Sequence, residues 1–414
     1  MTRVDALDVH VELQGVPVLA GRAQFNRRRG GLSATMFQYD PGYLSRPQSY
    51  DIDPDFGLYT GSQQASGLPA AFSDSAPDRW GRNLILKRER ALALQDKRPQ
   101  RTLDDVDYLV RVGDITRQGA LRFRRDAGSP FLDPDHTVPK LIRLPELMRA
   151  SEAASQDDGE QGLAAVKLLL DAGTGSLGGA RPKAAVRGDD GRLLIAKFPH
   201  REDEWDVMAW EATALDLASA AGLTVPTYTL TALDGSNALL LDRFDRAADG
   251  TRIGYMSAMT LLQRSDGAGG DYVEIAEALE ESTARVKQDL LELFRRAALN
   301  VGLRNTDDHL RNHGFLRHDI GWVLSPVFDI NPEPDPKSRQ TTIAGASVPD
   351  DESEGLDELA RACRLSPADA REERHRIADV LEGWRDAAAA NNVRDSEFTR
   401  FAGAFKRGMA VLRR

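Results

Sequence analysis

The sequence has one cysteine, Cys363, among its 414 residues. A single thiol excludes an intrachain disulfide and a cysteine-rich metal site, and it fits a protein of the reducing cytoplasm. The chain also lacks long apolar runs, because none approaches the roughly 18 residues that a membrane helix needs. No apolar signal core follows Met1. We therefore expect a soluble cytoplasmic protein with no membrane partner.

The sequence also lacks a net positive charge, since its 54 Lys and Arg residues are outnumbered by 64 Asp and Glu residues, giving a net charge of −10. A chain this acidic does not coat nucleic acid by bulk charge, which requires a clustered basic surface. Hydrophobic residues make up 41% and charged residues 29% of the chain, which is ordinary globular usage. The length is enough for about two or three domains with a substantial core.

The hydropathy pattern changes along the chain, from strands near the N-terminus to helices near the C-terminus. Alternating apolar residues predict strands at the start, and helical periodicity follows near Trp80 and Val106. A polar stretch, 150–161, predicts a linker. Further along we expect a hairpin over 184–197, a helix over 205–221, strands over 227–232 and 237–242, and a mostly helical region from 256 that an irregular stretch interrupts at 305–336. These patterns predict an α+β protein in three parts: 1–150, 151–245 and 246–414.

A glycine-rich segment, 173–183, is the first candidate binding site. Its glycines at Gly175, Gly178 and Gly179 allow backbone N–H groups to approach a phosphate closely. The spacing also spells a dinucleotide-binding fingerprint, but that fold needs a helix directly afterwards and an acid about 20 residues further on. Pro182 interrupts such a helix, and a basic residue stands where the acid belongs. The segment is therefore interpreted as a phosphate-binding loop, with an unspecialised flexible loop as the alternative.

Lys197 ends the apolar strand expected over 193–197, and Glu211 follows in the next helix. Protein kinases use this arrangement, in which a strand lysine holds the α- and β-phosphates of ATP and a helix glutamate orients the lysine. Taken alone, such residues are usually solvated at the surface. Their order after the glycine-rich segment favours the kinase interpretation.

The segment 305–315 is dense in polar residues that kinases use for catalysis. Asp307 and Asn312 have the Asp-x4-Asn spacing of a kinase catalytic loop, in which the aspartate receives the proton of the substrate hydroxyl and the asparagine binds magnesium. Asp329 follows an apolar run about twenty residues later, where the second magnesium ligand belongs. His309 lies inside the loop and is expected to brace it. In the alternative interpretation, these residues merely close turns.

Two other interpretations stay open at this point. His309 and His313 are four residues apart, with His318 beyond them, a spacing that a metal-dependent hydrolase could use. Asn312 and Gly314 make a poor helix, however, and no glutamate lies between the histidines. The second alternative is a degenerate kinase fold that binds ATP and acts by docking a DNA-binding regulator.

Together these motifs resemble the HipA family of bacterial serine/threonine kinase toxins. The likeness is carried by five groups of residues: 72–78 with 112–114 and 119–121, then 176–183, 241–246, 306–312 and 328–329. The first matches the family's N-terminal module in kind, and the second resembles its Ser-x-x-Gly-Ala-x-x-Lys loop. The third is similar to the strand end where adenine meets the hinge, and the last two resemble the catalytic loop and the metal-binding pair. One departure is Asp308, which replaces a glycine of some members.

The resemblance implies a two-lobed, protein-kinase-like fold whose three parts are a small β-rich N-terminal subdomain, a kinase-like N-lobe and a mostly helical C-lobe. It also implies ATP and Mg2+ as cofactors. The residues implied to bind the nucleotide are Gly175, Ser176, Gly178, Gly179, Lys183, Lys197, Glu211, Asp242 and Phe244. The implied catalytic residues are Asp307, Lys197 and His309. The implied metal ligands are Asn312 and Asp329.

The resemblance further implies a target and a mode of regulation. Ser176 is the implied autophosphorylation site. A translation protein, such as an aminoacyl-tRNA synthetase, is the implied substrate. A small helix-turn-helix antitoxin is the implied partner, and operator DNA is expected to be contacted mainly through that antitoxin.

Overall fold

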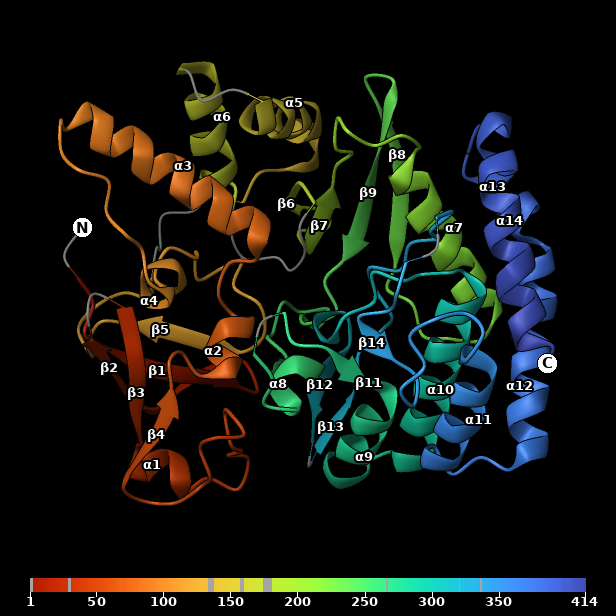
Figure 1. Ribbon diagram of the computed structural model, residues 1–414. Helices are drawn as coiled ribbons and strands as arrows, with labels where there is room; N and C mark the ends of the chain where they lie inside the picture. Colours follow the sequence, from red (N-terminus) through yellow and green to blue (C-terminus); the bar gives the residue numbers. More distant parts are fainter. Residues whose placement is uncertain are drawn as a thin grey trace. The chain divides into compact units, whose positions relative to one another are not determined.

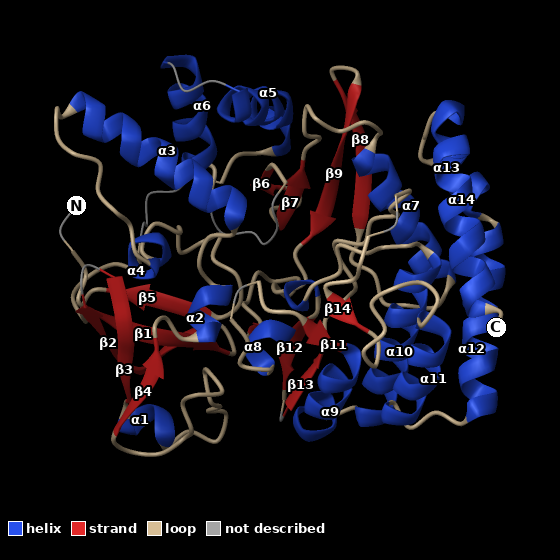
Figure 2. Cartoon of the chain, in the orientation of Figure 1, coloured by secondary structure: helices blue, strands red, loops and turns tan. Residues whose placement is uncertain are grey.

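The computed structural model describes residues 3–28, 31–132, 138–156, 160–173, 181–265, 267–319, 321–335 and 337–414. The chain forms two compact units. Unit 1 consists of Met1–Arg201 and Leu233–Met256, and unit 2 consists of Glu202–Ala232 and Ser257–Arg414. The fold is mixed α+β, with a β-rich N-terminal region (Figure 1) and a mainly helical C-terminal region (Figure 2), as the sequence predicts. The expected division at residues 150 and 245 stays a prediction.

Unit 1 begins with a five-stranded antiparallel sheet in the order β4-β3-β2-β1-β5. Its strands are β1 (Ala6–Leu13), β2 (Val16–Arg28), β3 (Gly31–Tyr39), β4 (Ser62–Ser66) and β5 (Leu121–Arg124). Leu7, Val9 and Val11 are completely buried, because alternate residues of a strand face the same side of the sheet. The turn after β1 places Gln14 and Gly15 at positive φ, a conformation that glycine adopts at no steric cost. The predicted N-terminal strands are thus confirmed.

Unit 1 also contains a helical layer. Its helices are α1 (Pro41–Leu44), α2 (Ala70–Asp74), α3 (Arg79–Gln95), α4 (Asp105–Leu109), α5 (Leu144–Gln156) and α6 (Glu160–Asp171), with one 3-10 turn, η1 (Leu141–Arg143). A single hydrophobic cluster joins Leu84 of α3, Leu147 of α5 and Leu169 of α6. The same cluster includes Ala184 and Ala196, so these helices pack on the second sheet of the unit.

The linker expected over 150–161 is wrong. Helix α5 runs through Gln156, and α6 begins at Glu160. Ala150 and Ala154 are buried and lie one helical turn apart, so the segment has a narrow apolar face. Its polar composition hides that face, because small alanines contribute little to the hydropathy of the stretch.

The second sheet of unit 1 places β7 (Leu193–Lys197) between β6 (Lys183–Arg187) and β9 (Ser236–Asp242), with antiparallel pairing on both sides. The hairpin predicted over 184–197 is confirmed as β6 and β7. Gly191 lies in its turn at positive φ. The register of this hairpin fixes which residues at its open end face each other.

Unit 2 packs around the long helix α10 (Val286–Gly302). Its other helices are α7 (Val207–Ala220), α8 (Ala258–Leu261), α9 (Tyr272–Ser282), α11 (Glu352–Ala362), α12 (Pro367–Glu382), α13 (Trp384–Ala390) and α14 (Asp395–Leu412). Helix α10 contacts α9, α11, α12 and α14. The helix predicted over 205–221 is confirmed as α7, and its Trp210 stacks on Phe401 of α14 with ring centroids 3.8 Å apart. Within the described ranges, every helix is too short or too polar to traverse a bilayer.

Short strands also occur in unit 2. They are β11 (Gly270–Asp271), β12 (Gly314–His318), β13 (Gly321–Leu324) and β14 (Thr341–Thr342), while β8 (Tyr228–Leu233) and β10 (Tyr255–Ser257) cross the unit boundary. The stretch 305–336 is therefore not wholly irregular, because β12 and β13 form an antiparallel hairpin within it. Phe315 and Trp322 are buried there. The apolar residues of the two strands stabilise the hairpin although polar residues lie at its turn. The parallel pair of β11 and β14 lies beside the site described next.

Candidate active site

Asp307 and Asn312 lie in one irregular segment of unit 2, residues 305–312. The segment follows α10 and ends in a single 3-10 turn, η3 (Leu310–Asn312). The backbone N–H of Asn312 closes this turn by donating to the carbonyl of His309 at 2.8 Å. The side-chain Nδ2 of Asn312 donates to the carbonyl oxygen of Asp307 at 3.3 Å. The structure therefore brings together the two residues that the Asp-x4-Asn spacing pairs.

Asp307 and Asp308 are neighbours in very different surroundings. Asp307 is exposed, and its Oδ1 accepts a hydrogen bond from Gln340 Nε2 at 3.2 Å, whereas Asp308 is only 2% exposed. Desolvation by nearby protein atoms raises the pKa of Asp307, and the negative charge of Asp329 raises it too, while His309 opposes both. A solvent-accessible carboxyl with a raised pKa is suited to accept a proton.

Asp329 lies close enough to Asp307 for its charge to act on that carboxyl. Its backbone has a φ of 57°, a left-handed conformation that is uncommon outside glycine and that clusters at functional sites. Asn312 is buried, and together with Asp329 it offers one amide oxygen and one carboxylate group. These fit Mg2+, which keeps several waters and binds through few protein ligands together with substrate phosphates.

The histidines of this region do not form a metal site. His313 is 2% exposed, and its Nε2 lies 3.0 Å from Asp308 Oδ1. His309 precedes η3, so no α-helix holds these two histidines at i and i+4. The side chain of His318 is 55% exposed. In the part of the chain that the structure describes, no group of three or more His, Cys, Asp or Glu residues is arranged to hold a metal ion. The geometry thus disfavours the hydrolase alternative.

A buried polar network beneath the segment is one feature that the sequence did not predict. Tyr272 donates its hydroxyl to Asp308 Oδ2 at 2.6 Å, and Asn300 Nδ2 donates to the Tyr272 oxygen at 2.9 Å. The backbone N–H of Thr341 donates to the Asp308 carbonyl at 3.0 Å. Burial opposes ionisation of Asp308, but the charge of His313 and hydrogen bonds from His313 and Tyr272 hold its pKa below the usual range. The one sign of this network in the sequence is Asp308, an acidic residue directly after the expected base, Asp307.

Buried ion pairs tie α11 to the start of the segment. Arg339 donates to the backbone carbonyls of Asn305 at 2.8 Å and Asn300 at 3.0 Å. Arg339 and Arg304 both pair with Glu352 of α11, each at 2.5 Å. All three charged side chains are almost completely buried. The position of Asp307 therefore depends on side chains from α9, α10 and α11 as well as on its own backbone.

In unit 1, the β6–β7 hairpin places Lys183 directly opposite Lys197. The two residues are 2% and 7% exposed. Opposed residues of an antiparallel pair have side chains on the same face, and like charges there are destabilising. Asp78, the N-cap of α3, supplies one compensating charge, since Lys183 Nζ lies 3.1 Å from Asp78 Oδ2. Two close lysines of this kind suit the binding of a phosphate group.

For the other residues expected to bind nucleotide, the structure describes only some positions. Four of them lie outside the described residues: Gly175, Ser176, Gly178 and Gly179. Glu211 is completely buried in α7, so it is not a solvated surface acid. It belongs to unit 2 and Lys197 to unit 1, and their pairing stays a prediction.

The end of β9 holds the two residues expected at the adenine-binding hinge. Asp242 pairs with Arg192 of the neighbouring turn. Phe244 is half-buried, with its ring centroid 6.3 Å from that of Tyr255. Their role in nucleotide binding stays a prediction.

The residues just after this hinge form a buried ionic cluster that the sequence analysis did not anticipate. Asp245 Oδ2 lies 2.6 Å from Arg243 and 2.9 Å from Arg246, and it accepts the backbone N–H of Gly119 at 2.8 Å. Although burial opposes ionisation of Asp245, these two arginines hold its pKa below the usual range. The cluster ties the strand end to the loop before β5.

Comparisons with known proteins identify two matching family models and a curated relative. A family model described as the HipA-like C-terminal domain matches residues 175–387, and one described as the HipA N-terminal domain matches residues 18–124. The Sinorhizobium fredii protein Y4mE, which carries a kinase designation, is 23% identical over 244 residues, covering 52% of this chain and 56% of that protein. The chain thus matches little more than half the length of this curated relative.

Among solved structures, a similar one is HipA of the Shewanella oneidensis MR-1 toxin–antitoxin system, determined with HipB and its operator DNA. It aligns with a TM-score of 0.66 at 14% identity, covering 98% of this chain and 96% of that chain. At this level of identity the likeness concerns the fold.

Proposed function

Since the chain belongs to the HipA family, we propose that it is an ATP- and Mg2+-dependent protein serine/threonine kinase that acts as the toxin of a toxin–antitoxin pair. The observation that supports this most strongly is the 305–312 segment, in which Asn312 is bonded to Asp307 and Asp329 lies nearby. Protein kinases place their base and their magnesium ligands in this way.

In the proposed reaction, Asp307 accepts the proton of a substrate Ser or Thr hydroxyl. The hydroxyl oxygen forms a bond to the γ-phosphorus of ATP, the bond to the bridging oxygen breaks, and ADP leaves. Asn312 and Asp329 would hold Mg2+, which neutralises charge on the phosphate oxygens when it is bound. Lys183 and Lys197 would contribute positive charge for the same phosphates.

The partners and the control of the enzyme are also proposed. The substrate is a translation protein such as an aminoacyl-tRNA synthetase, as the family resemblance implies, and the site of action is the cytoplasm. The Shewanella HipA was solved with HipB and operator DNA, which supports a small helix-turn-helix antitoxin and, through it, operator DNA as partners here. Ser176 is the proposed autophosphorylation site, as the family resemblance implies. A phosphate there would add about −1.5 to −2 charge and repel the phosphates of ATP, so it would act as a switch that turns the enzyme off.

Nucleotide binding tests the proposal first. Mg-ATP should raise the melting temperature of the protein in a thermal shift assay, and NAD+ should not. A shift with NAD+ and none with ATP would overturn the kinase proposal.

Mass spectrometry then tests the switch. After incubation with Mg-ATP, the peptide that contains Ser176 should carry a phosphate in the wild type and none in the Asp307→Asn variant incubated alone. Mixing active enzyme with that variant should restore the modification. Absence of phosphate on Ser176 under all conditions would remove the switch and leave the kinase proposal standing.

A further inference from the structure

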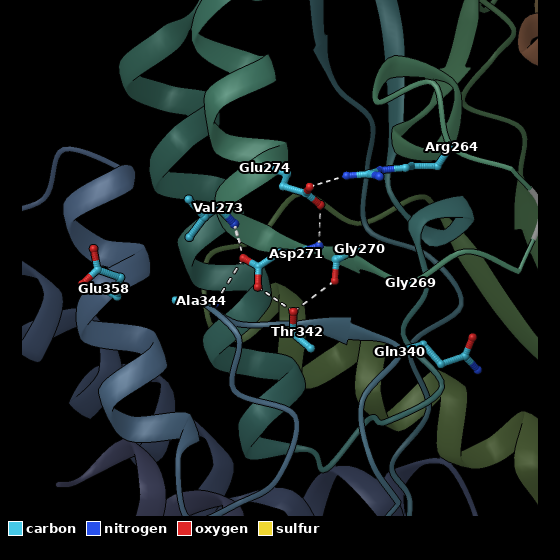
Figure 3. Close-up of a pocket in the computed structure, with 10 residues that line it drawn as sticks. All are labelled: Arg264, Gly269, Gly270, Asp271, Val273, Glu274, Gln340, Thr342, Ala344 and Glu358. Atoms are coloured by element: carbon cyan, nitrogen blue, oxygen red, sulfur yellow. Dashed lines mark hydrogen bonds and ion pairs between the residues drawn. The ribbon is translucent and has the colours of Figure 1, made fainter.

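A pocket of about 710 Å³ lies in unit 2 (Figure 3). Its walls come from residues around β11, residues around β14 and Glu358 of α11. Pockets of about 300–1,000 Å³ are large enough for small ligands or for a few side chains of a partner. None of the roles discussed above uses this pocket.

The pocket adjoins the 305–312 segment on two sides. Gln340, in its wall, donates its side-chain amide to Asp307 Oδ1 at 3.2 Å. Gly270, also in the wall, rests against Leu310 of η3 so closely that a Cβ on this glycine would lie 2.4 Å from the leucine Cδ2. A group bound against Gln340 is therefore separated from the proposed base by one side chain.

The walls of the pocket are held in place before anything binds. The carboxylate of Asp271 accepts hydrogen bonds from the N–H groups of Val273 at 2.8 Å, Ala344 at 3.1 Å and Gly345 at 2.7 Å, and from the Thr342 hydroxyl at 2.5 Å. Several of these bonds are drawn as dashed lines converging on Asp271 in Figure 3. Asp271 thus serves the structure of the pocket, and its oxygens are already engaged.

The lining is acidic, and Glu358 is the more exposed of its two glutamates. The lining contains three acids, Asp271, Glu274 and Glu358, and one base, Arg264, so its formal charge is −2. Glu274 pairs with Arg264 at 2.5 Å and also accepts the Asp271 N–H at 3.1 Å. Glu358 has a side chain 52% exposed and pairs with the more exposed Arg361 on its own helix. Such surface pairs contribute about 0–1 kcal/mol, so an incoming cation can replace Arg361 easily.

We propose that this pocket binds an arginine or lysine side chain of the protein substrate, and that Glu358 is the residue that selects it. The proposal rests on the proposed kinase function, because it places the acceptor hydroxyl at Asp307. An extended chain advances about 3.3 Å per residue, so the selected basic residue lies within a few residues of the acceptor Ser or Thr. Glu358 is a specificity residue, and it takes no part in phosphoryl transfer.

Peptide binding tests this assignment. Two fluorescent peptides, Ala-Arg-Arg-Ala-Ser-Ala-Arg-Arg-Ala and its counterpart with glutamine at every arginine position, are titrated by anisotropy against the full chain with Mg2+ and a non-hydrolysable ATP analogue. A third peptide carries glutamate at those positions. We expect the arginine peptide to bind at least 10-fold more tightly than the glutamine peptide. Glu358→Lys should weaken its binding at least 5-fold, and Glu358→Gln should weaken it less.

The matched control is Glu372→Lys, an equal charge change at an exposed position of α12 that does not line the pocket, and it should alter binding less than 2-fold. Equal losses in the two lysine variants would show attraction by bulk charge and would overturn the proposal. So would equal affinity for the arginine and glutamine peptides, no binding of the arginine peptide, or preference for the glutamate peptide, which would make Arg264 the anchor.

The binding assay also separates this proposal from the proposed function. If the peptide pattern holds but Mg-ATP neither binds nor donates phosphate, the kinase proposal fails and the basic-residue pocket stands. If phosphate is transferred but the peptides are not discriminated, the pocket assignment fails and the kinase proposal stands.

Discussion

The two regions that would carry the chemistry are built in different ways. Lys183 and Lys197 of unit 1 are positioned by a regular antiparallel ladder, in which register alone sets them opposite each other. Asp307 of unit 2 lies in an irregular segment that buried polar side chains hold from below. A ladder survives most single side-chain changes, whereas a buried polar group left without its partner costs about 1–3 kcal/mol. We therefore expect the lysine pair to be robust and the Asp307 segment to be sensitive to single substitutions.

Among the substitutions considered, Asp308→Ala should lower the free energy of unfolding most. It removes the buried carboxylate that Tyr272 and His313 contact. Removing one partner of a buried ion pair typically lowers the free energy of unfolding by about 3–5 kcal/mol, and we expect a loss of that size in urea denaturation. Asp319→Ala, at an exposed position, should change it by less than about 0.5 kcal/mol. Wild-type stability in Asp308→Ala would mean that the backbone alone holds the segment.

Asp78→Ser probes the lysine pair of unit 1. Serine keeps the N-cap of α3 but removes the charge beside the buried Lys183. Because serine leaves an acceptor oxygen at this position, we expect the free energy of unfolding to fall by about 3 kcal/mol, the lower end of the range for a broken buried ion pair. Asp40→Ser makes the same exchange at the N-cap of α1 and should have little effect. Chemical denaturation of both variants checks the difference. A loss in Asp78→Ser larger than that in Asp308→Ala would reverse the comparison between the two regions.

Tyr272→Phe tests whether the network positions Asp307 or only stabilises unit 2. It removes the hydroxyl that donates to Asp308 and accepts from Asn300. We expect the unfolding free energy to fall by about 1 kcal/mol, kcat to fall about 10-fold, and the KM for ATP to stay unchanged. Steady-state kinetics measures this split, with Tyr59→Phe at an exposed tyrosine as the control. A raised KM at constant kcat would argue against a positioning role.

His10, in β1 of the five-stranded sheet, gives unit 1 a smaller loss of stability in acid. Burial and the charge of Arg124 lower the pKa of His10 to about 4, whereas the unfolded chain binds this proton near its ordinary pKa of about 6.5. The contribution to stability is full above about pH 6.5 and is lost as the pH falls towards 4, about 1 kcal/mol of it between pH 7 and 5.5.

The variant His10→Leu should reduce this pH dependence by that amount in urea denaturation at the two pH values. His318→Leu, at a histidine whose side chain is 55% exposed, should leave the pH dependence as in the wild type. If His10→Leu also left it as in the wild type, His10 would not be the group that titrates.

The regular parts of the molecule could be predicted because their signals are local. Alternation at Leu7 and Val9 indicates a buried strand, and the glycine turn between β6 and β7 fixes the hairpin that pairs Lys183 with Lys197. The Asp-x4-Asn spacing of Asp307 and Asn312 lies within a single loop, so this motif could also be recognised from the sequence.

The rest could not be predicted because its contacts are distant in sequence. Tyr272 lies 36 residues from Asp308 and 28 from Asn300, and no periodicity connects residues so far apart. The linker prediction over 150–161 failed for another reason. The buried face of the helix there is formed by small residues, Ala150 and Ala154, which give a weak hydrophobic signal in a polar stretch.

The most direct test of the central claim is to measure ATP binding and phosphoryl transfer on the same preparation of Asp307→Asn. The substitution keeps the size of the side chain and removes the proton acceptor, whereas the lysine pair of unit 1 is untouched. We predict that the Kd for Mg-ATP, measured by calorimetry, stays within about 3-fold of the wild-type value, while transfer from labelled ATP falls by about 100-fold or more. Transfer at the wild-type rate would contradict the assignment of Asp307 as the base.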